Sequence, residues 1–190
     1  IQDTQFLTDF NKTLPSDIRV TSIRPVSAGF HSRKSAVSKT YTYYTMLSGK
    51  PDVFFKNYAY CPADTPFRLK NADLPPLSYP EMRTAADALC GTHDFTSFTS
   101  DKTPSKSHVR RIDSVTVDTV TLPSGIELLR FTFCGNGFLY NMVRILSGTL
   151  LSVGLGQIPA AQIPAIIEGK SRPLAGPTLP PCGLFLTDVT

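Results

Sequence analysis

The amino-acid sequence predicts a mixed fold of β-strands and α-helices joined by ordered loops. The chain has 190 residues, 41% of them hydrophobic, which is enough to bury a core in one large domain or two small interlocked ones. It contains 16 prolines and 12 glycines, more than a helical bundle usually has. Stretches with strand-like alternation and stretches with helical spacing also occur in the same chain. We therefore expect strands and helices together.

In the first half, helical spacing and strand composition alternate. The run of Thr and Tyr from Thr40 to Thr45 favours a strand with aromatic residues on its surface. Proline suits the first turn of a helix and glycine suits its end, so Pro80 and Gly91 predict the limits of a second helix. The expected elements are a helix over residues 5–14 closed by Pro15, a strand over 18–26, a strand over 35–46, a loop or connector over 61–80, and a helix from Pro80 to Gly91.

In the second half, a β-hairpin and an apolar helix are the clearest elements. Pro123 and Gly125 lie between two β segments, and Leu129, Phe131 and Phe133 share one face of the second. The expected elements are a polar, exposed and mobile loop over 97–107, strands over 112–121 and 126–133, a helix that spans Phe138 to Val153, a short helix over 160–168 and a last strand over 184–189.

Arg144 is the only charged residue between Cys134 and Gln162. A helix that is apolar on most sides is usually buried, and a buried charge is costly unless a partner neutralises it. An ordinary solvent-facing arginine would need polar neighbours one turn away, whereas this one has Tyr140 before it and Gly148 after it. We expect Arg144 to be buried or to line a cleft, close to an anion.

The cysteines, histidines and charges exclude several classes of protein. Four widely spaced cysteines and three histidines give neither a zinc pattern nor a disulfide framework, so we expect reduced thiols and no metal. The longest apolar run, residues 145–155, is too short and too glycine-broken to span a bilayer, and no signal peptide is visible. These features favour a soluble, cytoplasmic protein. A net charge of +4 allows a polyanionic partner without requiring one.

Basic residues concentrate in two places. Either cluster alone is as common on an ordinary solvated face as in a phosphate site. Beside a tyrosine-bearing strand they favour nucleic acid, because stacking planes next to phosphate contacts hold single-stranded or flipped bases, although Tyr41 alone fits an ordinary strand position equally well. The clusters are His31, Arg33, Lys34 and Lys39, and Lys102, Lys106, His108, Arg110 and Arg111.

His93 and Asp94 follow the expected helix end at Gly91. They suit an acid/base pair, and a hydrolase would need them to converge in a cleft with Ser97 or another nucleophile. A turn between two inward-packing phenylalanines explains the same residues, and we favour this structural interpretation.

The order and spacing of a dozen short motifs resemble the TruA family of tRNA pseudouridine synthases over nearly the whole chain. The motifs are Phe30-His-Ser-Arg33, Ser35-Ala36, Lys39-Thr-Tyr41-Thr-Tyr43, Gly91-Thr-His-Asp-Phe95-Thr-Ser-Phe98, Val109-Arg110, Phe138 to Arg144, Gly148-Thr-Leu150, Val153-Gly154, Ala175-Gly-Pro177 and Gly183-Leu-Phe-Leu186. The resemblance implies an α+β pseudouridine synthase fold, an antiparallel sheet with helices packed on it. It also implies a homodimer.

The resemblance further implies an enzyme that isomerises uridine to pseudouridine at positions 38 to 40 of the tRNA anticodon stem and loop, without cofactor or metal. The family's catalytic aspartate lies in a Gly-Arg-Thr-Asp-x-Gly-Val-His motif that this chain lacks. The chain begins at Ile1 without methionine and looks like the C-terminal part of such an enzyme, with residues 1–50 ending the N-terminal half and 51–190 forming the C-terminal half. The segment alone is expected to be inactive.

Three positions match the family's active site. Tyr41 matches the tyrosine that stacks on the flipped base, Arg144 the arginine that pairs with the catalytic carboxylate, and Leu184 the apolar residue lining the uracil pocket. His31, Arg33, Lys39, His108, Arg110 and Arg111 lie in stretches expected to touch tRNA. Tyr140 and Asn141 stand where the family commonly has two histidines, so the resemblance implies no RNA contact for them.

A second hypothesis is a non-catalytic RNA-binding module that kept the family's surface and lost its nucleophile. The gene upstream of Ile1 would distinguish the two, because an in-frame Gly-Arg-Thr-Asp motif there indicates an enzyme.

Overall fold

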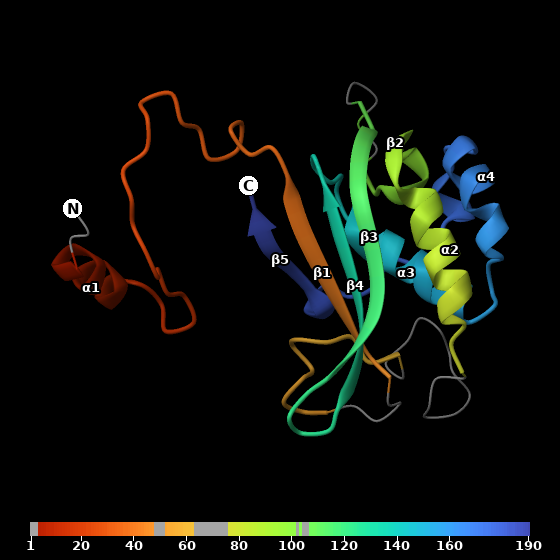
Figure 1. Cartoon of the computed structure of the whole chain (residues 1–190), viewed down its shortest axis with the longest axis horizontal. Helices are drawn as coiled ribbons and strands as arrows, with labels where there is room; N and C mark the ends of the chain where they lie inside the picture. The colour runs from red at the N-terminus through yellow and green to blue at the C-terminus, as the bar shows by residue number, and fades with distance from the viewer. Residues whose placement is uncertain (1–3, 48–51, 63–75, 102, 104–106) are drawn as a thin grey trace. The chain divides into compact units, whose positions relative to one another are not determined.

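The computed structural model describes residues 4–47, 52–62, 76–101, 103 and 107–190 (Figure 1). The chain divides into two compact units, Ile1–Ser35 and Ala36–Thr190. The predicted boundary between family halves at residue 50 stays a prediction.

The first unit contains one helix, α1 (Thr4–Thr13), which ends before Pro15 close to its predicted end. The side-chain amide of Asn11 holds the backbone of Val20, donating from Nδ2 to the carbonyl (2.9 Å) and accepting at Oδ1 from the N–H (2.8 Å). The prediction of a strand over residues 18–26 is wrong, because these residues have no strand partner in the described part of the chain. Alternation produces a strand only where another strand takes up its backbone hydrogen bonds.

The second unit is built on a five-stranded antiparallel sheet, which confirms the predicted α+β class. Its strand order is β2-β3-β4-β1-β5, so β5 is an edge strand. The strands are β1 (Lys39–Met46), β2 (Gly91–Asp94), β3 (Val109–Thr121), β4 (Glu127–Gly135) and β5 (Leu184–Val189). The central strand β1 pairs with β4 on one side and β5 on the other, and thus joins chain segments far apart in sequence.

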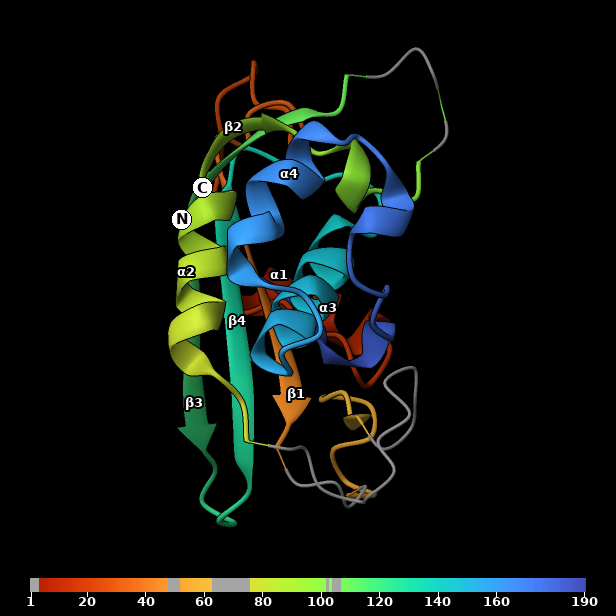
Figure 2. The ribbon, with the colours of Figure 1, turned by 90° about the vertical axis from the view of Figure 1, so that its right-hand side faces the viewer.

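Three helices cover one face of this sheet (Figure 2). They are α2 (Tyr79–Leu89), α3 (Met142–Gly154) and α4 (Ile163–Glu168), the last preceded by a 3-10 turn at Ala160–Gln162. The predicted face of Leu129, Phe131 and Phe133 is fully buried beneath them. In α2 the four apolar residues at helical spacing, Met82, Ala85, Ala86 and Leu89, are buried.

The predicted hairpin joins β3 to β4. The N–H of Gly125 donates to the carbonyl of Leu122 (2.8 Å), and the N–H of Leu122 donates to the carbonyl of Ile126 (2.9 Å). Gly125 has a φ of 81°, which glycine adopts without the steric cost of a Cβ.

Several details differ from the sequence predictions. The helix expected from Phe138 begins only at Met142, and the strand expected from residue 35 begins at Lys39. Gly91 does not cap α2, since the helix ends at Leu89 and Gly91, with a φ of 110°, opens β2. The start of the expected exposed loop is instead a 3-10 turn at Thr96–Phe98, in which Ser97 and Phe98 are fully buried. The polar residues of this segment predicted exposure, but the Ser97 hydroxyl is buried because the carbonyl of Ile166 and the N–H of Ser171 take up its hydrogen bonds. The expected connector over 61–80 lies mostly outside the described residues.

Candidate active-site pocket

A pocket of about 290 Å³ lies where the N-terminus of α3 meets β1 and the start of β5. Its lining includes Tyr41, Arg144 and Leu184, the three residues that the resemblance places in the active site. They come from β1, α3 and β5. The structure therefore brings the three to one pocket, and their chemical roles remain predictions.

Arg144 is half-buried on the first turn of α3. Its Nε donates to the backbone carbonyl of Leu179, and its Nη1 donates to Oδ1 of Asn141 (2.8 Å). No described carboxylate lies within ion-pair distance of it. The expected cleft-lining position is found, and the neutral oxygens leave the positive charge without a counter-ion in the described part of the chain.

The carbonyl of Leu179 reaches Arg144 because the preceding loop lies directly on α3. A Cβ at Gly148 would be only 2.0 Å from the carbonyl oxygen of Pro177, so glycine is needed for this approach. One residue further along α3, Thr149 Oγ1 accepts from the N–H of Gly176 (2.9 Å). The N–H of Leu179 then donates to the carbonyl of Arg144 (3.3 Å), so Leu179 contacts Arg144 through both its backbone groups.

Asn141 precedes α3 with a left-handed backbone, φ 61°. Its side chain does not cap the helix N-terminus, although asparagine commonly does so. It accepts instead from Arg144 and donates through Nδ2 to Ser100 Oγ (3.3 Å). The carbonyl of Tyr140 accepts from Ser100 N–H (3.2 Å) and Thr99 Oγ1 (3.1 Å), which ties this turn to the segment that follows Phe98.

Tyr41 supplies an aromatic plane to the pocket. Its ring meets that of Phe138 edge to face, with ring centres 5.2 Å apart and planes at 83°. In such a T-shaped pair the edge of one ring meets the face of the other, and the pair stabilises by about 1 kcal/mol beyond area burial. Tyr41 is half-buried.

Leu184 enters the pocket from a short 3-10 turn at Pro181–Gly183. Gly183 is buried so close to β1 that a Cβ there would lie 2.4 Å from the carbonyl oxygen of Tyr44. The hydroxyl of Tyr43 donates to the carbonyl of Pro180 (2.7 Å) and fixes the start of this turn. Burial raises the pKa of Tyr43 well above its ordinary value, so the phenol stays protonated.

The predicted RNA-binding residues are not all alike in the structure. Lys39 opens β1 and is half-buried. Arg111 is exposed and pairs with Asp113 (Nε to Oδ1, 2.7 Å), whereas Arg110 bonds the carbonyls of Ser107 (3.0 Å) and Val109 (2.6 Å).

The other three predicted RNA contacts differ again. His108 is half-buried, with Nδ1 3.0 Å from Thr96 Oγ1. His31 and Arg33 belong to the first unit and are exposed there.

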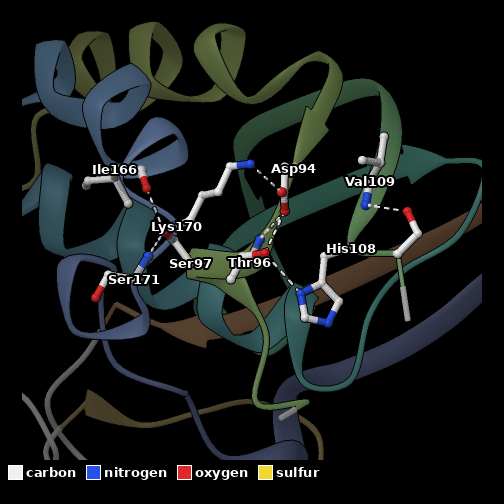
Figure 3. Close-up of polar contacts among 9 residues, drawn as sticks. Asp94, Thr96, Ser97, His108, Val109, Ile166, Lys170 and Ser171 are labelled. Carbon is white, nitrogen blue, oxygen red and sulfur yellow. Dashed lines mark hydrogen bonds and ion pairs between the residues drawn. The ribbon is translucent and has the colours of Figure 1, made fainter. Parts of the chain in front are cut away.

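His93 and Asp94 form no catalytic pair in the structure. Asp94 accepts from Thr96 Oγ1 (2.6 Å) and pairs with Lys170 (2.8 Å), as Figure 3 shows. The hydrogen bond from Lys170, then that from Thr96, holds the pKa of the Asp94 carboxyl below its ordinary value. His93 Nε2 lies 2.9 Å from the carbonyl oxygen of Cys90.

Ser97 is equally unsuited to the role of nucleophile. Its hydroxyl donates to the carbonyl of Ile166 (2.6 Å) and accepts from the N–H of Ser171 (2.8 Å), and it is fully buried (Figure 3). Neither hydrogen bond of this hydroxyl is to His93 or Asp94. The network ties β2 to the end of α4, which supports the structural interpretation of these residues.

In the described residues no three His, Cys, Asp or Glu side chains are arranged to hold a metal ion. No described helix combines the length and apolar character needed to cross a membrane.

Sequence reasoning missed two partners of Arg144. Leu179 contributes only its backbone, so no pattern of side chains indicates it. Asn141 was visible in principle, because side chains three residues apart meet on a helical turn.

Comparison with known proteins identifies the family. The family model described as tRNA pseudouridine synthase matches residues 85–190. The chain is 42% identical to tRNA pseudouridine synthase A of Bacillus subtilis over 94% of its own length and 66% of the relative's. It is 40% identical to tRNA pseudouridine synthase A 1 of Bacillus cereus over 100% of its length and 70% of the relative's. The chain thus spans about two thirds of the length of these relatives. Both the matched family model and the identity to these relatives show that the chain belongs to the tRNA pseudouridine synthase family, as its motifs suggested.

Proposed function

We propose that this chain is the larger part of an enzyme that isomerises uridine to pseudouridine at positions 38 to 40 of the tRNA anticodon stem and loop. The names of its relatives support the reaction and the class of substrate. We also propose that residues 1–190 alone do not catalyse it, because the family's aspartate motif is not among them.

The observation that carries the proposal is the guanidinium of Arg144, which has no counter-ion in the described part of the chain and lies in a pocket shared with Tyr41 and Leu184. Five N–H groups belong to a guanidinium, and the described contacts use one on Nε and one on Nη1. The two N–H groups of Nη2 and the second on Nη1 remain for an anion. A carboxylate suits that edge, because two parallel N–H···O bonds match its two oxygens.

Each of the three residues then has a distinct role. The reaction breaks a glycosidic bond and reattaches the ring through carbon, so the base must leave its stack and be held. Tyr41 offers its face to the uracil, and Leu184 keeps water from the ion pair and so strengthens it. Arg144 keeps the catalytic carboxylate ionised and oriented.

Six residues outside the pocket lining are proposed to bind tRNA. Lys39, His108, Arg110 and Arg111 supply positive charge or hydrogen-bond donors on the second unit, and His31 and Arg33 on the first. Their contribution is expected to weaken as salt rises, as phosphate contacts do. A cytoplasmic homodimer that needs no cofactor completes the proposal.

The test uses the full-length protein, with any residues that the gene encodes before Ile1. It is incubated with unmodified tRNA transcripts, and pseudouridine is mapped by mass spectrometry in transcripts that retain uridine at only one of positions 38, 39 and 40. Arg144→Gln is expected to lower kcat on the order of 100-fold. Arg83→Gln, which removes an exposed arginine from α2, is the matched control and should be active.

No pseudouridine from the full-length protein would refute the proposed reaction. Wild-type rates from residues 1–190 alone would refute the proposed inactivity of the segment.

A non-catalytic RNA-binding module is the alternative, favoured by the missing aspartate motif. It predicts tRNA binding without any pseudouridine and no Gly-Arg-Thr-Asp motif in frame upstream of Ile1. Reading the gene distinguishes the two directly.

A further inference from the structure

We propose that Asn141 is a positioning residue for Arg144, which holds the guanidinium so that its Nη edge faces the pocket. The inference rests on the proposed function, and it adds a residue to which the resemblance gives no role.

The contacts of Arg144 define one orientation of its plane. Nε is held by the carbonyl of Leu179 and Nη1 by Oδ1 of Asn141 (2.8 Å). With only the Leu179 bond, the group can still turn about its Nε–H···O contact. The Asn141 bond removes that freedom. Reaction geometry is sensitive to displacements of about 1 Å, so this restraint matters for a carboxylate that Arg144 must orient.

The surroundings also fix the Asn141 amide itself. A guanidinium can only donate hydrogen bonds, so the amide atom facing Nη1 must be the oxygen. The nitrogen then points to Ser100 Oγ, 3.3 Å away, which has lone pairs to accept. Ser100 in turn donates its N–H to the carbonyl of Tyr140 (3.2 Å). The chain of contacts runs from the segment after Phe98 through Asn141 to Arg144.

A second observation is that Asn141 departs from a local preference. It adopts a left-handed φ of 61°, which asparagine tolerates better than most other non-glycine residues. Its side chain also makes no bond to the N–H groups of α3, where asparagine usually contributes about 1 kcal/mol as a cap. Local preferences are most often broken where a site requires it. Here the side-chain amide of Asn141 accepts a hydrogen bond from Arg144 instead of capping the helix.

The competing explanation is that asparagine is present only because it tolerates the left-handed backbone. Asn141→Gly separates the two, since glycine adopts that backbone freely and removes the amide. Asn141→Asp keeps an oxygen facing Arg144 but adds a negative charge, which competes with the catalytic carboxylate for the guanidinium. Arg83→Gln is again the control, because it changes an exposed residue of α2 that takes no part in these contacts.

The experiment measures pseudouridine formation by the full-length enzyme at several tRNA concentrations. For Asn141→Gly we expect kcat to fall about 10- to 100-fold, with KM within about twofold. We expect Asn141→Asp to be slower still, although it retains the acceptor. Arg83→Gln should stay within about threefold of the unsubstituted enzyme. An Asn141→Gly enzyme with unchanged kcat would overturn the inference, as would a loss confined to KM.

A measurement independent of activity separates this inference from the proposed function. The Nη groups of a held guanidinium give distinct NMR signals, and free rotation averages them. The signals of Arg144, assigned by their loss in Arg144→Lys, should be distinct in the unsubstituted protein and averaged in Asn141→Gly. Distinct signals in both would refute the positioning role, whether or not the enzyme makes pseudouridine.

Discussion

The contact between Gly148 and Pro177 gives the most demanding prediction for the pocket. In Gly148→Ala the new Cβ would lie 2.0 Å from the carbonyl oxygen of Pro177, whereas Cβ contacts below 3.0 Å are essentially never seen. The obstacle is backbone, so the loop must recede by about 1 Å. Leu179, two residues after Pro177, should move with this loop, and its carbonyl should lose the hydrogen bond from Nε of Arg144.

The net effect combines two opposing contributions. Alanine improves the helix propensity of α3 by about 1 kcal/mol relative to glycine. Overpacking of a well-packed site costs about 1–3 kcal/mol, and more where backbone has to move. We expect Gly148→Ala to lower the free energy of unfolding by about 1–3 kcal/mol and to reduce kcat as well.

Gly154→Ala is a matched control in the same helix. Its Cβ would meet Sδ of Met82 at 2.7 Å, the flexible end of a side chain that can change rotamer. We expect its stability to stay within about 1 kcal/mol of the unsubstituted protein. Urea unfolding followed by circular dichroism gives both values. If Gly148→Ala proves as stable and as active as Gly154→Ala, the packing argument for Leu179 is refuted.

Three further substitutions test the surroundings of the site by urea unfolding. Tyr43→Phe removes the bond to Pro180 and should cost about 1 kcal/mol at pH 7. Because the pKa of Tyr43 is raised by folding, the unsubstituted protein should lose stability as the pH rises above 10.0, and the variant should lose less. Asp94→Asn should cost about 1 kcal/mol at neutral pH. Folding lowers the pKa of Asp94, so the stability difference between the unsubstituted protein and Asp94→Asn should shrink as the pH falls below 3.8. Asp94→Asn should also keep the enzymatic activity of the full-length protein, which a hydrolase mechanism that uses Asp94 would not allow. Ser97→Ala should cost about 1–3 kcal/mol, because it leaves the carbonyl of Ile166 and the N–H of Ser171 unpaired; an unchanged stability would contradict its buried role.

Local signals predicted the fold well where neighbours in sequence are also neighbours in space. The hairpin of β3 and β4 needs only its turn residues and its alternating apolar face, and α3 only its apolar spacing. The expected strand over 18–26 was wrong because pairing depends on a distant partner, which alternation cannot reveal. Burial of Ser97 was missed for the same reason, since its acceptor on Ile166 is 69 residues away.

The pocket shows the same limit. Tyr41, Arg144 and Leu184 lie on three elements, and no spacing within the sequence predicts that they meet. The resemblance to a family suggested them together, and the structure places them on one pocket. The backbone carbonyl of Leu179 could not be foreseen from side chains. The isolation of Arg144 among apolar residues did indicate, from composition alone, that this one charge required explanation.

The place of β5 at the end of the strand order affects how residues 1–190 behave in solution. One edge of β5 pairs with β1, and no described strand pairs with the other. Unpaired edges can add strands from other molecules, and exposed Leu186 and Val189 offer apolar contact to such a strand, with Asp188 the single charge between them. Self-association of residues 1–190 at high concentration would therefore reflect this edge and not the homodimer proposed for the whole enzyme, so the two must be compared at matched, low concentrations.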